Sequence, residues 1–322
     1  MKKLLFLSSV CLFLVGGIKT TPATPRLVTQ NPAPTTPAAV PAQLELLTAG
    51  TEPRQQLRLK PQANTKQLMT MTMNMDVAMT LAGQAMPKIK TPATVMKMEV
   101  LVTQVDANGD IHSKFTYTDG DVVADASVAP EILESVRSGI KKMVGISGTL
   151  TTDNRGQIKS SNLTLPESVD PLSKTFLEQV SNSLEQMGSP MAQEAVGIGA
   201  KWRVSSQLKM GAINMNQSAV YELVSLKDNV ATLNITVEQQ ADAQEVTLPG
   251  IPTGSANVSL KSLTSQGQGQ MTQPLSSIMP TRSTMSVRSQ NEMSIKEPDS
   301  GKEMTIGTQM SMQMDLESKL SQ

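Results

Sequence analysis

Two methionine-rich stretches contain the residues whose spacing most directly suggests chemistry. In LMTMTMNMDV (residues 68–77) methionine takes every second position, and QMSMQMDLES (residues 309–318) repeats the pattern near the C-terminus. Thioether sulfurs are soft ligands that suit Cu(I). A copper site would draw its ligands from Met69, Met71, Met73, Met310, Met312 and Met314. Copper needs sulfurs that converge on one point, however, whereas alternate residues of a strand stand about 6–7 Å apart in a row.

The favoured interpretation is one apolar face of a half-buried strand. Thr70, Thr72 and Asn74 separate the methionines, and methionine is an adaptable apolar filler. A segment at residues 94–106 alternates in the same way. We therefore predict no metal site, and we predict that an apolar groove would be lined by Met69, Met71, Met73, Met75, Met96, Met98, Met310, Met312 and Met314.

Other chemistry-bearing residues lack the partners that a reaction needs. His112 is the only histidine, and it is expected on a solvated polar face, which excludes a histidine-built zinc site or triad. DANGD (residues 106–110) is typical of a hairpin turn, because no glutamate closes it as a calcium loop. Gly197 and Gly199 lack the third glycine of a phosphate loop. The sequence predicts no catalytic residues, no cofactor and no enzyme.

Composition excludes further classes of partner. The chain has 28 basic and 28 acidic residues, so it lacks the positive charge expected for nucleic-acid binding. Aromatic residues make up only 2%, so few side chains could stack on bases. The expected partner is an unidentified envelope protein or an apolar ligand.

The N-terminus, MKKLLFLSSVCLFLVGG, has the pattern of a secretory signal peptide. Lys2 and Lys3 precede an apolar run from residue 4 to residue 15, and Val15 and Gly17 have the small-residue spacing of a cleavage site, with Ala23 as a second choice. Cys11 is not predicted to be lipidated, because Val10 precedes it in mid-run. We expect an exported protein, periplasmic or extracellular, with no stable membrane span after cleavage.

Three regions are predicted along the chain. Residues 1–17 form the signal peptide, and residues 18–56 form a disordered linker rich in Pro, Thr and Ala. Residues 57–322 form a single β-rich domain with halves at about 57–188 and 195–322. Because Cys11 is the only cysteine, no intrachain disulfide can hold this domain, and a sizeable core must do so.

Periodicity predicts both strands and helices. Helices are expected at residues 130–143 and 170–187, each with an apolar stripe and a proline in its first turn. The expected strands are 68–82, 94–106, 111–119, 145–153, 156–165, 219–226, 229–240, 257–272, 276–295 and 303–317. The predicted fold is α+β: a predominantly antiparallel, strongly curved sheet in two pseudo-repeated halves, with two helices packed on one face.

The segment AVGIGAKW (residues 195–202) carries a resemblance. Its Gly197, Gly199 and Trp202, after a helical middle and before a second β-half, resemble an uncharacterised family of exported bacterial β-rich proteins. These have a signal peptide and a duplicated β-unit with a Gly-x-x-Trp motif. The resemblance covers about residues 54–295, and it implies location and fold but no functional residues.

These observations predict a non-enzymatic exported cell-envelope protein with a structural or partner-binding role. The alternative is a periplasmic carrier of an apolar ligand, either a lipid or a hydrophobic peptide. In that case the methionine-lined concave face of the sheet would hold the ligand.

Overall fold

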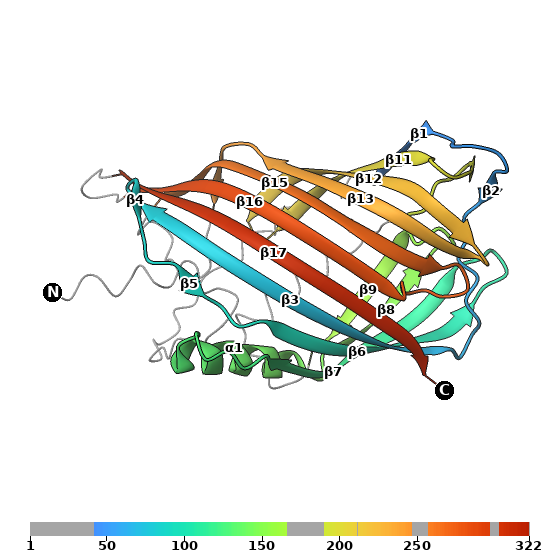
Figure 1. Cartoon of the computed structure of the whole chain (residues 1–322), viewed down its shortest axis with the longest axis horizontal. Coiled ribbons are helices and arrows are strands. Elements are labelled where there is room, and N and C mark those ends of the chain that lie inside the picture. Colours follow the sequence, from blue (N-terminus) through green and yellow to red (C-terminus); the bar gives the residue numbers. More distant parts are fainter. Residues whose placement is uncertain (1–41, 166–189, 211, 247–256, 297–302, 322) are drawn as a thin grey trace, which may run out of the picture.

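The computed structural model describes residues 42–165, 190–210, 212–246, 257–296 and 303–321. These residues form almost entirely antiparallel β-structure (Figure 1). The strands of the first half are β1 (Gln43–Thr48), β2 (Gln55–Gln56), β3 (Lys66–Leu81), β4 (Gln84–Ala85), β5 (Ile89–Lys90), β6 (Thr94–Val105), β7 (Ile111–Val122), β8 (Ser147–Thr152) and β9 (Ile158–Thr164). Those of the second half are β10 (Ala195–Val196), β11 (Lys201–Met210), β12 (Ile213–Lys227), β13 (Val230–Ala241), β14 (Gln244–Val246), β15 (Asn257–Pro274), β16 (Arg282–Lys296) and β17 (Glu303–Ser321).

One 15-stranded sheet holds nearly all of these strands. Its order is β1-β11-β12-β13-β15-β16-β17-β3-β6-β7-β8-β9, with β14 beside β15 and with β4 and β5 beside β3. The strands β2 and β10 form a separate pair. The last strand, β17, pairs along its length with β3, so the C-terminal strand lies beside an N-terminal strand in the middle of the sheet (Figure 1).

Tight turns join the long strands where the sequence contains residues that tolerate positive φ. Asp228 and Asn229, with φ of 52° and 58°, link β12 to β13 in a two-residue hairpin. Gly109, with φ of 88°, closes the turn between β6 and β7. These turns fix the register of the strands, and hence decide which side chains share a face.

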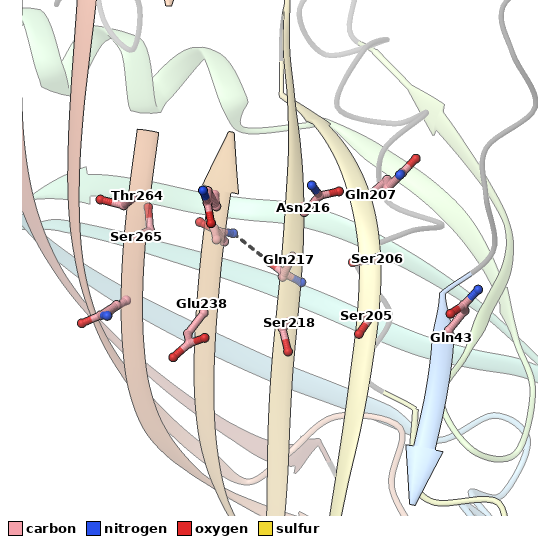
Figure 2. A pocket seen from close by; sticks show the side chains of 13 residues that line it. Gln43, Ser205, Ser206, Gln207, Asn216, Gln217, Ser218, Glu238, Thr264 and Ser265 are labelled. Atoms are coloured by element: carbon pink, nitrogen blue, oxygen red, sulfur yellow. Dashed lines mark hydrogen bonds between the residues drawn. The ribbon is translucent and has the colours of Figure 1, made fainter. Parts of the chain in front are cut away.

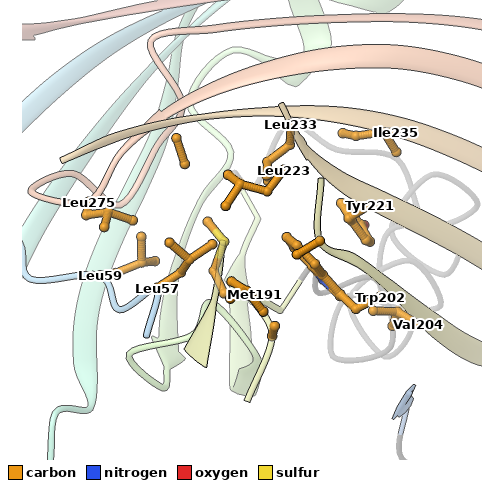
Figure 3. Close-up of a cluster of buried hydrophobic side chains, with 14 of the residues drawn as sticks. Leu57, Leu59, Met191, Trp202, Val204, Tyr221, Leu223, Leu233, Ile235 and Leu275 are labelled. Atoms are coloured by element: carbon orange, nitrogen blue, oxygen red, sulfur yellow. The ribbon is translucent and has the colours of Figure 1, made fainter. Parts of the chain in front are cut away.

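The sheet curls so that distant strands share one core. Val102 on β6 and Trp202 on β11 lie in the same buried cluster, although six strands lie between β6 and β11 in the sheet order. We call the face that carries Trp202 the inner face and the opposite face the outer face. Figure 3 shows the cluster inside the curl, with side chains from several strands pointing toward one another.

One end of the curl is filled by residues 49–61 and 190–200, which we call the end plug. Leu57 and Met191 of the plug are 0% and 3% exposed. The backbone of the plug joins opposite parts of the sheet: Lys60 N–H donates to Leu275 O at 2.6 Å, and Met191 N–H donates to Arg155 O at 2.8 Å. The plug therefore covers the inward side chains at this end of the sheet and encloses a hydrophobic core there.

The predicted α+β class with two helices is wrong. The described residues contain a single helix, α1 (Pro130–Met143), and otherwise form one continuous sheet rather than two equivalent halves with helices on one face. The helix predicted at residues 170–187 lies outside the described residues. Helix α1 itself was predicted at the correct bounds, because Pro130 occupies its first turn and its apolar residues recur at helical spacing.

The predicted linker also extends too far toward the C-terminus. Residues 43–48, assigned to the linker, form β1 and pair with β11. Leu44 and Leu46 alternate with polar residues there, but the segment follows a Pro-, Thr- and Ala-rich stretch, and the edge of β11 supplies its pairing. Residues 49–56, also assigned to the linker, belong to the end plug and include β2, whereas the proposed signal peptide and residues 18–41 lie outside the described residues. In the ranges that the structure covers, no helix is long and apolar enough to cross a membrane.

Candidate binding surface

The methionines predicted to line a groove lie together on three neighbouring strands. β3 pairs with β17 on one side and with β6 on the other, so the two methionine-rich stretches are neighbours. Met73 lies opposite Met314, and Met75 lies opposite Met312. Paired residues of an antiparallel ladder point to the same face, so the methionines form one contiguous surface. We call it the methionine surface: Met69, Met71, Met73, Met75, Met96, Met98, Met310, Met312 and Met314.

The methionine surface is closed at one end and half-open along the rest. Met69 and Met96 are both only 6% exposed. The remaining members, on β3, β6 and β17, are half-buried, while the residues between those of β17 are mostly exposed. The thioethers thus face the inside of the curl without being fully sealed. Met285 on β16 extends the surface opposite Met314 and was not singled out from the sequence, although it alternates with Val287 in the same way.

Helix α1 covers the closed end of this surface. Gly120 of β7 lies opposite Met96, and a Cβ at Gly120 would come within 2.6 Å of Ile140 Cγ2 in α1. The absence of a side chain at Gly120 therefore lets the helix approach the strand. This close approach explains why Met96 is buried while Met312, farther from the helix-bearing strand, is not.

A polar furrow runs across the strands on the inner face, where Ser206, Gln217, Gln239, Ser265, Ser289 and Met310 line it together with their chain neighbours. Two hollows of about 550 and 810 Å³ follow one another from β1 to β3 and share residues of β15. Figure 2 shows side chains of the first hollow rising from neighbouring strands, with Ser205, Ser218 and Glu238 in one row. The second hollow includes Lys90 and Arg288. By register, Glu238, Lys90 and Arg288 lie on the outer face, so the inner residues of the furrow present mainly uncharged polar groups.

His112 is less solvated than predicted. Its Nε2 lies 2.8 Å from Asp106 Oδ2, and its Nδ1 lies 3.2 Å from Thr151 Oγ1 on β8. The hydrogen bond from His112, with a second from Gln104, lowers the pKa of the Asp106 carboxyl. The contacts tie the β6–β7 turn to β8. The only histidine thus has a carboxylate and a hydroxyl beside it, neighbours that the sequence did not predict.

The DANGD segment forms the predicted hairpin turn. Asp106 N–H donates to Asp110 O at 2.8 Å and closes the loop. The Asp110 carboxylate accepts two hydrogen bonds from Lys159 Nζ, at 2.6 and 2.8 Å, which lower its pKa. The two carboxylates of the turn therefore pair with His112 and Lys159 in place of a common cation. Among the described residues, no three His, Cys, Asp or Glu side chains are placed to hold a metal ion.

The AVGIGAKW segment has a packing role. A Cβ at Gly197 would lie 1.7 Å from the backbone oxygen of Thr51, so only glycine fits where the two parts of the end plug cross. Trp202 is 0% exposed and anchors the core, where it stacks on Tyr221 with ring centroids 5.7 Å apart. Its Nε1–H donates to Pro190 O at 3.1 Å, which satisfies its buried polar atom.

Comparison with known proteins adds little. No protein-family model and no curated protein matches the chain. The solved structure of OpdQ from Pseudomonas aeruginosa is 7% identical over 80% of this chain and 98% of its own, with a TM-score of 0.23. OmpF of Salmonella typhi in complex with daunomycin is 7% identical (78% and 98% covered, TM-score 0.21), and OccAB3 of Acinetobacter baumannii is 6% identical (80% and 99% covered, TM-score 0.22). Likeness at this level carries no argument about fold or function.

Proposed function

We propose that the protein is a non-enzymatic, exported binding protein that holds an apolar ligand against its methionine surface. The observation that carries the proposal is the register of β6, β3 and β17, which gathers methionines from segments far apart in sequence on one half-buried inner face. Thioether side chains are flexible and polarisable, and they pack against apolar molecules of varied shape. A lipid or a hydrophobic peptide would gain from leaving water here.

The test begins with the protein purified after export. Extraction with organic solvent, followed by mass spectrometry, should recover an apolar molecule in stoichiometric amount, and the emptied protein should bind an apolar fluorescent dye. Replacing Met75 and Met312 together by Gln, which is similar in volume but polar, should weaken dye binding about tenfold or more. The matched control replaces Asn74 and Gln313, a directly paired outer-face neighbour pair, by Ala and should leave binding unchanged. If the purified protein yields no apolar molecule and binds no dye, the proposal fails.

Export is part of the proposal and has its own support. The first 17 residues have the signal-peptide pattern, and no cysteine follows Cys11. Expression of the full chain, fractionation, and N-terminal sequencing of the recovered protein should show cleavage after Gly17 and release to the periplasm or the medium. Retention in the cytoplasm would contradict it.

A structural or partner-binding role in the envelope is the second candidate, and the charged residues of the outer face favour it. Glu238, Lys90 and Arg288 lie on that face in three different strands, and charges of both signs suit recognition of a protein surface. Chemical cross-linking in intact cells separates the two roles. A specific partner whose cross-linking is lost in an Arg288→Glu variant that still binds dye would support partner binding on the outer face.

A further inference from the structure

A row of uncharged polar side chains crosses the inner face of the sheet. Five strands that neighbour one another in the sheet, β11, β12, β13, β15 and β16, each place one such residue in it, and each residue is directly paired with the next. We call this row the polar belt: Ser206, Gln217, Gln239, Ser265 and Ser289. The next residue of the row, on β17, is Met310 of the methionine surface. The belt therefore leads directly onto the proposed apolar site.

On β11, β12 and β13 the polar belt interrupts faces that are otherwise apolar. On β11 the inward residues Val204 and Leu208, both 4% exposed, flank Ser206. On β12 the inward Ala219 and Met215, 3% and 6% exposed, flank Gln217 in the same way. Burying polar atoms among apolar neighbours costs free energy unless hydrogen bonds compensate. Polar side chains repeated at these positions on neighbouring strands therefore need hydrogen-bond partners.

The belt is only partly satisfied within the described part of the chain. Gln239 Nε2–H donates to Gln217 Oε1 at 2.7 Å, the bond drawn in Figure 2. Ser206 is 7% exposed, and its buried Oγ has no hydrogen-bond partner in the structure as described. A buried hydroxyl without a partner is destabilising in the free protein. A ligand that offered it a donor or acceptor would remove this cost.

The chemistry of the belt and of its flanking rows selects the kind of partner. The belt residues are amides and hydroxyls, and the inward residues on either side of it on β11, β12 and β13 are aliphatic or Met. An ionised head group placed there would lose its water without gaining an opposite charge. A neutral head group with hydroxyl or amide functions would find donors and acceptors, and its chain could continue from Met310 along the methionine surface.

We infer that the apolar ligand is a neutral amphiphile whose uncharged, hydrogen-bonding head group lies on the polar belt. This inference rests on the proposed function and adds the class of ligand to it. It is tested with two probes of equal chain length, 1-lauroylglycerol and laurate, the latter ionised at pH 8. Binding of each to the full-length, solvent-extracted protein is measured by displacement of an apolar dye, below the concentrations at which micelles form.

The neutral probe should bind about tenfold more tightly than laurate. In the variant Gln217→Leu/Gln239→Leu this preference should fall to about twofold or less, because both amides are gone while the volume is kept. The matched control, Asn216→Leu/Gln240→Leu, changes the neighbouring, directly paired residues of the outer face and should keep the preference. Ser206→Ala supplies a second readout: it should raise the urea midpoint of the free protein and weaken binding of the neutral probe alone.

The outcomes separate the two proposals. If wild-type protein binds dye and both probes but shows no preference, or prefers laurate, the head-group assignment is overturned and apolar binding stands. If the Gln217→Leu/Gln239→Leu variant folds and keeps the wild-type preference, the belt is not the head-group site. If neither the dye nor either probe binds wild-type protein, the proposed function itself fails.

Discussion

The end plug region and the methionine surface use the same alternating strand pattern and reach different degrees of burial. Around the plug, Trp202, Leu223 and Leu233 are at most 1% exposed, because residues 49–61 and 190–200 fill the space above them. On the methionine surface, Met73 and Met314 are paired just as regularly and remain half-buried. Alternation therefore decides which face turns inward, and the loops that cross the curl decide whether that face becomes a core or a surface.

The comparison implies that stability resides mainly at the plugged end. Replacing Trp202 by Ala should lower the free energy of unfolding by about 3–5 kcal/mol, because it removes a fully buried ring and leaves a cavity. Urea denaturation followed by circular dichroism measures this. A loss below about 1 kcal/mol would mean that the plug region is not the main core.

The crossing of the plug segments offers a second test at the same end. Gly197→Ala places a methyl group against the backbone oxygen of Thr51, so one segment must shift. We expect a loss of about 2–3 kcal/mol in unfolding free energy, in the range of overpacked sites. Gly199→Ala is a useful contrast, because the strain there comes from its φ of 82° alone and nothing lies within 4 Å of the added carbon. Equal effects of the two substitutions would argue against close packing at Gly197.

Within the methionine surface, two substitutions sharpen the comparison between closed and open ends. Met69→Ala, at a site 6% exposed, should cost about 2 kcal/mol of unfolding free energy, whereas Met312→Ala, at a half-buried site, should cost about 1 kcal/mol. Parallel urea titrations of both variants measure the difference. A cost for Met312→Ala as large as that for Met69→Ala would show that the surface is sealed and cannot serve as an open site.

The smallest effect is expected just before α1, where surface hydrogen bonds and an ion pair, rather than core packing, hold the side chains. Hydrogen bonds from Ser127 and Lys90 lower the pKa of Asp125 to about 2, and its ion pair with Lys90 measures 3.2 Å. The unfolded carboxyl has a pKa of about 3.9, so the stabilisation is complete above that pH and is lost as pH falls toward about 2. An NMR titration of the Asp125 carboxyl measures its pKa, and hydrogen exchange of residues 125–132 at pH 5 and pH 2 measures the local stability. Asp125→Asn should make that local stability independent of pH in this range. A carboxyl that titrates near pH 4 would contradict the expectation.

Several parts of the fold could be predicted because the signals are local. The alternation at residues 94–106 and 229–240 marked the strands β6 and β13, and Pro130 with its apolar stripe marked α1. The strand at residues 43–48 does alternate Leu44 and Leu46 with polar residues, but it follows a Pro-, Thr- and Ala-rich segment, and only its pairing with β11 shows that it belongs to the sheet. The fold class failed for a similar reason: joining two runs of strands into one sheet depends on the contact between β17 and β3, which are more than 200 residues apart.

The candidate site shows the same division. Each methionine could be assigned to a strand face from its spacing, but no single segment reveals that β3, β6 and β17 are neighbours. The polar belt was missed, because Ser206 and Gln217 are unremarkable within their own strands. They gain significance only when register aligns them with Gln239, Ser265 and Ser289 across the sheet.

The sequence alone determined the period-two ribbons, their turns and the apolar character of one side of each ribbon, since these depend on neighbouring residues and on backbone sterics. The tertiary structure decided which ribbons lie side by side, which inward faces are covered, and where a buried hydroxyl lacks a partner. Those outcomes depend on contacts between residues far apart in the chain, whose entropic cost is recovered only when the whole sheet closes over its core.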